Sequence, residues 1–322
     1  MKKFKILSLC MSLLVTSAIF IGCANNDKKT NVKKDTPKEI NLTYVKAPLN
    51  VPSILEKKQN SFDNAFKKDD IKINWHEITS GPKQTQALAS GDLQILHALG
   101  GTSAILAKAN GVDLKIIGIY SRAPKAFMII SNNPDIKTAK DLKGKKIAGP
   151  KGTVLHQLLV GALEKNNLTS KDVNFINMGL PEGFAALNNK NVDAALLAGP
   201  VALKAIKNGG KIVANGEGIV DGTIVTAVSK TFLENHKDLV DKFKSTHKET
   251  LKFMKEHEEE TLKKVSQEVG LTIEETKQMY KWYDFDITIK DKDIKELQKT
   301  QDFMIKNGLQ DKKIDIKELI SK

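Results

Sequence analysis

Five short segments that follow predicted strands combine glycine, proline, serine or threonine, and they are the chain's best candidates for binding chemistry. They are Ser80-Gly81-Pro82, Gly100-Gly101-Thr102-Ser103, Pro150-Lys151-Gly152-Thr153, Leu180-Pro181-Glu182-Gly183 and Gly199-Pro200. Each stands where a helix is predicted to begin, and a helix start offers unpaired N–H groups and partial positive charge. Any one segment alone can be an ordinary cap or turn. Their recurrence at five strand ends indicates a cleft for an anion or a small polar molecule.

Arg122 and two histidines are further candidates for contact with a ligand. Arg122 is the only arginine and follows a predicted strand near Pro124. Its guanidinium suits a sulfonate or carboxylate, and it can equally be a hinge or surface residue. His97 ends a strand, where a packing role is the commoner one, and His156 lies one turn into a helix.

The sequence offers little for catalysis or metal binding. His247 and His257 lack the spacing of metal ligands, so we expect no metal site. No cysteine follows Cys23, and no nucleophile elbow, Walker loop or H-E-x-x-H pair is present. We therefore expect a binding protein that is not an enzyme and has no cofactor. An aromatic cluster at Tyr280, Trp282 and Tyr283 is best explained by packing between helices.

Short apolar runs alternate with amphipathic stretches from Ile40 onward, which predicts an α/β fold with mainly parallel sheets. Predicted strands are Ile40–Val45, Ile71–Trp75, Leu93–His97, Leu114–Tyr120, Ala126–Ser131, Lys145–Ala148, Val173–Asn177, Ala194–Ala198, Ile212–Val213 and Thr223–Val228. Predicted helices lie near 51–67, 82–90, 102–110, 153–165, 183–189 and 201–208. After Lys230 the chain is predicted to be almost wholly helical, with a capping box at Thr272–Glu275 and a last helix near 293–307.

The restart of this pattern after Pro134 predicts two lobes. Lobe 1 comprises residues 40–127 with 222–322, and lobe 2 comprises residues 128–221. Two crossings between the lobes make a hinge, which suits capture of a ligand in the cleft.

The first forty residues indicate export. Lysines near the start precede an uncharged apolar run from Ile6 to Gly22, which is the pattern of a signal peptide. The run ends in Phe20-Ile21-Gly22-Cys23, which resembles a bacterial lipobox. Residues 1–22 are then a signal peptide, Cys23 is the lipidated residue, and 23–39 form a flexible polar tether. We expect a protein anchored by lipid on the extracytoplasmic face of the cell membrane; an uncleaved N-terminal anchor is the alternative.

The chain is basic, with a formal net charge of +13 from 51 basic and 38 acidic residues. The lysines are dispersed along the sequence and the fork-shaped arginine side chain is nearly absent, so we expect no nucleic-acid binding.

The stretch from Ser80 to Pro200 resembles the substrate-binding proteins of the aliphatic sulfonate, taurine and nitrate importers and the related thiamine-pyrimidine binders. The features that match are Ser80-Gly-Pro with Ala87-Leu-Ala-Ser-Gly-Asp92, Ala139-Lys-Asp-Leu-Lys-Gly-Lys-Lys-Ile-Ala148 before Lys151-Gly-Thr153, Leu180-Pro with Ala185-Ala-Leu187, Val192-Asp-Ala194, and Val228-Ser-Lys-Thr-Phe232. Their order and spacing carry the resemblance over most of residues 40–250.

This resemblance implies a type II periplasmic-binding fold and the capture subunit of an ABC importer, a monomer that delivers a small anionic solute to permease and ATPase subunits. An aliphatic sulfonate or taurine-like solute is implied first, with nitrate or a thiamine-pyrimidine precursor as the alternative. A solute sensor or an enzyme of the same fold is a less favoured alternative. Carried over by position, the ligand-binding residues are Ser80, Gly81, Gly101, Thr102, Ser103, Gly152, Thr153, Pro181 and Gly199. Sulfonate binders often have an aromatic and an acidic residue where this chain has Gly199-Pro200, so a larger pocket is implied there.

Overall fold

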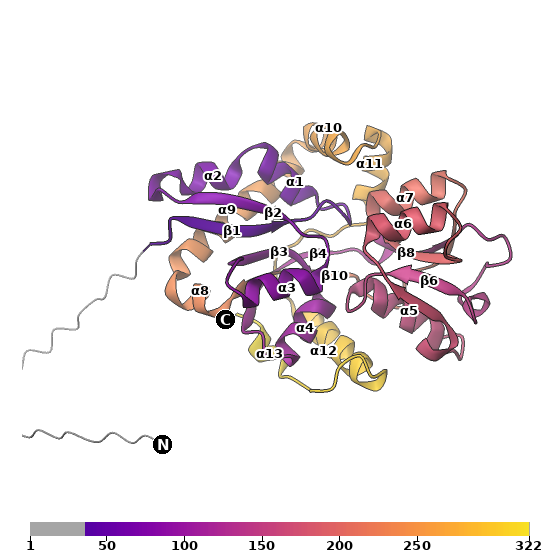
Figure 1. Cartoon of the computed structure of the whole chain (residues 1–322). Coiled ribbons are helices and arrows are strands. Elements are labelled where there is room, and N and C mark those ends of the chain that lie inside the picture. Colours follow the sequence, from indigo (N-terminus) through magenta and orange to yellow (C-terminus); the bar gives the residue numbers. More distant parts are fainter. Residues whose placement is uncertain (1–35, 322) are drawn as a thin grey trace, which may run out of the picture. The chain divides into compact units, whose positions relative to one another are not determined.

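A computed structural model describes residues 36–321, and it contains two five-stranded sheets with helices on their faces (Figure 1). The predicted α/β class is therefore confirmed. The predicted signal peptide, Cys23 and most of the tether lie outside the described residues. Among residues 36–321, no helix combines the length and apolar composition that crossing a membrane requires.

The first sheet, sheet A, has the strand order β2-β1-β3-β10-β4. Its strands are β1 (Glu39–Tyr44), β2 (Lys72–Glu77), β3 (Ile95–Gly100), β4 (Leu114–Arg122) and β10 (Thr223–Ser229). β1 pairs in parallel with β2 and β3, and β10 runs antiparallel between β3 and β4. Four strands therefore share one direction, so the sheet is mainly parallel, as predicted.

Sheet B has the order β7-β6-β8-β5-β9 and repeats this arrangement. Its strands are β5 (Phe127–Ser131), β6 (Lys146–Gly149), β7 (Asn174–Asn177), β8 (Ala194–Ala198) and β9 (Lys211–Asn215). Only β5 runs against the others. The chain enters sheet B at β5 and returns to sheet A at β10. The predicted lobe boundaries at 127/128 and 221/222 stay a prediction.

Apolar side chains bury both faces of each sheet, which explains the unbroken apolar runs of the strands. One face of sheet A packs against α3 (Gly81–Ala89), α4 (Gly101–Ala109), α12 (Asp291–Lys306) and α13 (Ile316–Leu319). The other face packs against α2 (Ser61–Phe66), α8 (Lys230–Asn235) and α9 (Lys237–Glu256). Sheet B shares its core with α5 (Val154–Glu164), α6 (Leu180–Asn188) and α7 (Gly199–Lys207).

The helical stretch predicted near 51–67 consists of two helices. The structure has α1 (Val51–Lys58) and then α2, with Asn60 between them in the left-handed region at φ 52°. A residue at positive φ interrupts a right-handed helix, and asparagine tolerates that conformation better than most residues. α10 (Glu258–Val269) and α11 (Ile273–Tyr280) complete the C-terminal helices. The predicted capping box at Thr272 and Glu275 is confirmed.

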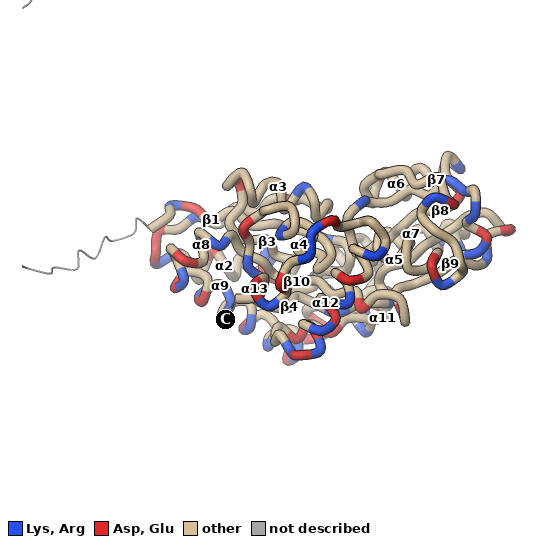
Figure 2. Tube along the Cα trace, turned by 90° about the horizontal axis from the view of Figure 1, so that it is seen from below, with Lys and Arg blue, Asp and Glu red and all other residues tan. Residues whose placement is uncertain are grey.

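Basic and acidic residues alternate along the trace, and no long stretch carries one sign alone (Figure 2). Many exposed lysines pair with nearby acids, for example Lys237 with Asp241 at 2.6 Å and Lys264 with Glu260 at 2.7 Å. Such exposed pairs contribute little stability. The expectation that the protein does not bind nucleic acid stays a prediction.

Candidate functional site

Six helices begin at one cavity, and this convergence is the main feature of the candidate site. The cavity encloses about 70 Å³, well above the roughly 10–15 Å³ that one water requires. Its lining includes the N-cap residue of each of these helices: Asn50 for α1, Ser80 for α3, Gly100 for α4, Thr153 for α5, Gly179 for α6 and Ala198 for α7. Three of the helices belong to sheet A and three pack on sheet B.

Chain topology produces this convergence. In each sheet, parallel strands end at the same edge, and the following helix must start there before it returns along the face. β1, β2 and β3 lead to α1, α3 and α4, while β6, β7 and β8 lead to α5, α6 and α7. Proline in the first turn favours a helix start, and it occurs in four of the six helices, at Pro52, Pro82, Pro181 and Pro200.

The cavity has a positive character without a charged side chain. None of the described residues that line it is acidic or basic. Five of the six N-caps make no side-chain capping bond; Thr153 alone accepts, from the main-chain N–H of His156 at 3.5 Å. First-turn N–H groups thus lack an intrahelical partner and carry the positive end of each helix dipole. The arrangement suits an anion that accepts several hydrogen bonds at once.

The rest of the lining is apolar, with a few neutral polar groups. Its larger apolar side chains are Val45, Pro48, Phe127, Val154, Leu155, Leu180 and Ile224. Asn50 and Gln84 each donate through the side-chain amide to a main-chain oxygen, of Val45 at 2.9 Å and Ile78 at 2.8 Å. The cavity can therefore hold an anionic head against helix starts and a short apolar tail against the wall.

A strained main chain forms part of this wall. Ala98 lines the cavity and has φ 79°, the left-handed region that residues with a Cβ rarely occupy. The opposite strand shifts register between Val225 and Thr226, so a β-bulge accompanies the strain. Strained residues of this kind persist where the surroundings hold them, commonly at binding sites.

The predicted ligand-binding residues lie in different places in the structure. Ser80, Gly81, Ser103 and Thr153 line the cavity. Thr102 and Gly152 lie in a groove outside it, together with Ser103 and Thr153, and Gly101 borders a small space beside Thr223. Pro181 lies in the first turn of α6, next to the lining residue Leu180. A ligand role for each of these residues stays a prediction.

Two of the predicted hydroxyls already hold the two sides of the cleft together. Ser103 donates to the main-chain oxygen of Gly152 at 2.8 Å. Thr102 donates to Gln157 Oε1 at 2.7 Å, and Gln157 donates in turn to Thr300 Oγ1 at 3.3 Å. These bonds connect α4 and α12 with the start of α5, so they join elements of the two sheets.

Gly199 does not enlarge the pocket as the resemblance implied. A Cβ at this position would lie 2.8 Å from the main-chain nitrogen of Leu49 and 2.9 Å from Pro48 Cα. The missing side chain instead lets the Pro48–Leu49 main chain approach α7, and Gly199 has φ +55°, which glycine adopts without strain.

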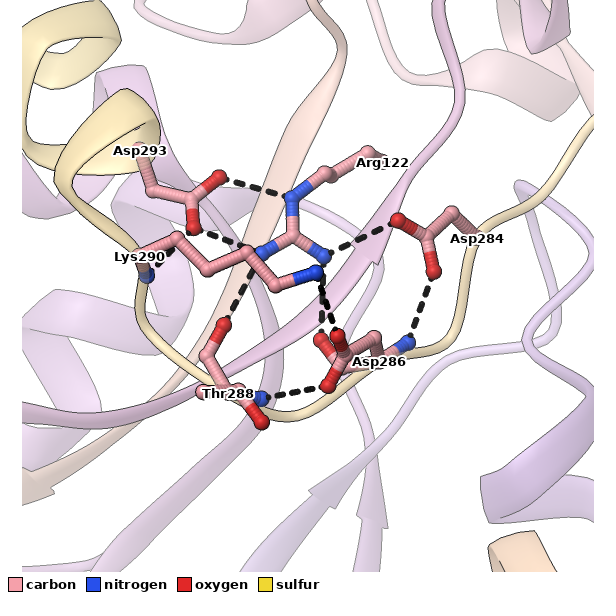
Figure 3. A network of polar contacts seen from close by, with 6 residues as sticks. All are labelled: Arg122, Asp284, Asp286, Thr288, Lys290 and Asp293. Carbon is pink, nitrogen blue, oxygen red and sulfur yellow. Dashed lines mark hydrogen bonds and ion pairs between the residues drawn. The ribbon is translucent and has the colours of Figure 1, made fainter.

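Arg122 does not line the cavity, which corrects the prediction that it contacts a ligand. Its guanidinium binds Asp293 through Nε at 2.7 Å and NH2 at 2.6 Å (Figure 3). NH1 donates to Asp284 at 3.2 Å and to the main-chain oxygen of Asp286 at 3.0 Å, and NH2 also donates to Thr288 O. All of its donors are therefore used, and they hold the segment between α11 and α12 against β4.

The predicted histidine candidates do not line the cavity either. His97 is fully buried, and its Nε2 donates to Glu56 at 2.7 Å, while His247 Nδ1 donates to the other Glu56 oxygen at 2.6 Å. These three side chains have a composition that could ligate a metal, but their short hydrogen bonds already satisfy the carboxylate. His156 borders the outer groove and stacks on Phe175 at 4.7 Å between ring centroids.

Asn50, Gln84 and Phe127 line the cavity and were not predicted. Asn50-Val51-Pro52 carries the same proline signal as the other helix starts, so Asn50 was detectable in the sequence. Gln84 and Phe127 carry no such signal, because only the folded chain brings them to the cavity. The aromatic cluster near Tyr283 packs against the cores on both sides, as predicted.

Comparison with known proteins identifies the family. Residues 64–261 match the family model described as NMT1/THI5 like. An aliphatic sulfonates-binding protein of Bacillus subtilis is 32% identical over 314 residues, which covers 96% of this chain and 93% of that protein. The chain belongs to this family. The taurine-binding periplasmic protein of Escherichia coli is 28% identical over 56% of this chain and 57% of its own.

Two solved structures have the same fold. The alkanesulfonate-binding protein SsuA from Xanthomonas axonopodis pv. citri, bound to MOPS, has a TM-score of 0.81 at 23% identity and covers 89% of this chain and 99% of its own. SsuA from Escherichia coli has a TM-score of 0.74 at 24% identity, with 89% and 93% covered. The predicted periplasmic-binding fold and the predicted family are thus confirmed.

We expect replacement of Arg122 to destabilise the protein without involving a ligand. Arg122→Ala leaves the Asp293 carboxylate buried without its partner, and removing one member of a buried pair costs about 3–5 kcal/mol. Urea unfolding of Arg122→Ala measures this cost. The double variant Arg122→Met with Asp293→Asn removes both charges and should recover part of the loss. An unchanged unfolding free energy in Arg122→Ala would contradict this role.

We also expect stability to fall as pH falls from 7 to 5. Burial lowers the pKa of His97, and burial with the nearby Lys151 charge lowers the pKa of His156 to about 4. In the unfolded chain both titrate near the usual value of about 6.5. The unfolded state therefore binds more protons over this range. His156 removes about 2 kcal/mol of stability between pH 7 and pH 5, and His97 acts in the same direction.

Urea unfolding of the wild type at pH 7 and pH 5 measures this loss, and His156→Gln provides the matched variant because it removes one of the two titrations. The difference in unfolding free energy between the two pH values should be smaller in His156→Gln. Equal stability of the wild type at both pH values would refute the assignment.

Proposed function

We propose that this protein is the extracytoplasmic solute-binding subunit of an ABC importer and that it captures a small aliphatic sulfonate. The observation that carries the proposal is the convergence of six helix N-termini on a cavity lined by uncharged described residues. A sulfonate has three acceptor oxygens and can meet N–H groups from several helices. Relatives named for aliphatic sulfonates and taurine support the choice of ligand class.

The apolar wall supports a ligand with a carbon tail over nitrate. Nitrate is polar on all sides and would leave side chains such as Leu155, Leu180 and Ile224 facing unfilled space. A thiamine-pyrimidine precursor remains the second candidate, because Phe127 offers an aromatic surface. The side-chain oxygens of Asn50 and Gln84, which have no partner among the described residues, offer acceptors for an amino group.

The lining residues support binding without catalysis. No described histidine, cysteine, lysine, aspartate or glutamate lines the cavity, so its serine and threonine hydroxyls have no adjacent general base there. A mutant of DszB bound to biphenyl-2-sulfinic acid has the same fold, at 14% identity and a TM-score of 0.62, and fold alone does not carry function.

We further propose that the protein acts as a monomer attached to the membrane through lipidated Cys23. The signal-like run from Ile6 to Gly22 and the polar residues after Cys23 support this attachment. It would hold the binding unit near the permease subunits that receive the solute.

Isothermal titration calorimetry against ethanesulfonate, taurine, nitrate and an aminopyrimidine tests the function. We expect ethanesulfonate to bind and taurine, which has the same carbon chain, to bind at least about tenfold more weakly. The reason is that no carboxylate among the described residues lines the cavity to pair with the ammonium group, and an unpaired buried charge is costly. Binding of none of these compounds would contradict the proposal, and preference for the aminopyrimidine would establish the second candidate.

The variant Ser80→Asp tests the anion site itself. Aspartate is a favourable N-cap for α3, so the fold should be retained, while its carboxylate occupies the helix start and repels a sulfonate. We expect sulfonate affinity to fall at least about a hundredfold, whereas the neutral and similarly shaped Ser80→Asn should lose less than about tenfold. Equal losses in the two variants would show that charge at this position is unimportant.

A further inference from the structure

A second groove lies away from the sulfonate cavity, and the two share none of their described lining residues. It has a volume of about 610 Å³ and runs between α9, α11 and the segment that follows α11. Buried or half-buried apolar side chains form its floor: Leu251, Met254, Tyr280, Tyr283, Phe285 and Ile287. An apolar groove of this size on a protein surface commonly receives a partner.

The floor is rigid before any partner arrives. Phe285 stacks on Tyr283 at 5.4 Å between ring centroids, with the planes only 6° apart, and on Tyr280 at 5.8 Å. Arg122 holds the same segment from behind through Asp284 and the main chain of Asp286 (Figure 3). A preformed groove loses little conformational freedom on binding, which favours affinity.

Two rows of lysines border this floor. Lys248, Lys252 and Lys255 lie at i, i+4 and i+7 on α9, so they share one face of that helix. Lys277 and Lys281 face them from the α11 side. All five are exposed.

These lysines are largely free to pair with a partner. Among residues 36–321, Lys252 makes one ion pair, with Glu256 at 3.8 Å, and the other four rim lysines make none. The acidic residues of the lining are mostly occupied, since Asp284 pairs with Arg122 and Asp286 with Lys290. Glu258 also lines the groove. The groove therefore presents an apolar floor between two rows of lysines, four of which make no ion pair within residues 36–321.

We propose that this groove is a docking site for an acidic amphipathic segment of a partner protein. Such a segment places apolar side chains on the floor while carboxylates on both of its edges meet the two lysine rows. A flat lipid surface would meet the lysines but not the recessed floor. A second copy of this chain is disfavoured because each copy carries a formal net charge of +13.

Fluorescence anisotropy with a labelled synthetic helix tests the proposal on the whole protein. The probe is about 18 residues, or roughly five turns, with leucine and phenylalanine along one face and glutamate on both sides of it. We expect it to bind, and the double variant Lys252→Glu with Lys281→Glu to weaken binding at least about tenfold. A probe of the same charge with serine on the apolar face should bind at least about tenfold more weakly than the original.

Matched controls separate docking from general attraction to a basic protein. Lys137→Glu with Lys211→Glu changes the net charge equally at exposed lysines that do not line the groove, one in the connection after β5 and one in β9. It should leave probe binding within about twofold. Equal weakening by both double variants, or equal binding of the serine-faced probe, would overturn the proposal. Vesicles of phosphatidylglycerol that bind the protein through Lys252 and Lys281 while the peptide does not would assign the groove to lipid instead.

Failure of this proposal is distinguishable from failure of the sulfonate function. The Lys252→Glu and Lys281→Glu variant should keep its calorimetric affinity for ethanesulfonate, because neither lysine lines the sulfonate cavity.

Discussion

The structure depends on one constraint: helices that follow parallel strands must begin at the same edge of the sheet. Both sheets obey it, and their strand ends meet at one cavity. Six sets of unpaired N–H groups are therefore gathered without any cationic side chain from the described residues. This positive potential comes from main-chain dipoles, so it requires no flexible cationic side chain. No acidic residue is then needed to balance such a side chain when the cavity is empty. It is well suited to reversible capture of an anion.

Polar groups on the two sides of the cavity form hydrogen bonds with one another. Ser103 with Gly152, and Thr102 with Gln157 and Thr300, supply hydrogen bonds between elements of the two sheets. Glycine at 199 lets the main chain at Pro48 pass close to α7. The residues that the sequence predicted to bind ligand thus have two kinds of position. Some line the cavity, and others form hydrogen bonds that join its two walls.

Charged residues serve the scaffold instead of the cavity. Arg122, the only arginine, donates all of its hydrogen bonds to the segment between α11 and α12 and to the first turn of α12. Glu56 accepts from two buried histidines inside the core of sheet A. This segregation explains why the formal charge of +13 says little about the ligand. It also leaves lysines on the outer surface, where those around the α9–α11 groove remain available for a partner.

The sequence by itself determined the α/β class, the succession of strands and helices along the chain and the five helix starts, because these follow from local patterns of apolar residues, glycine and proline. Its resemblance to known proteins indicated the family. Only the tertiary structure decided which of those residues face the cavity. Arg122 illustrates the difference, since its partners Asp284 and Asp293 lie far along the chain and no local pattern connects them. Likewise, Gln84 and Phe127 reach the cavity through packing between elements, which depends on contacts that single-sequence periodicity does not encode.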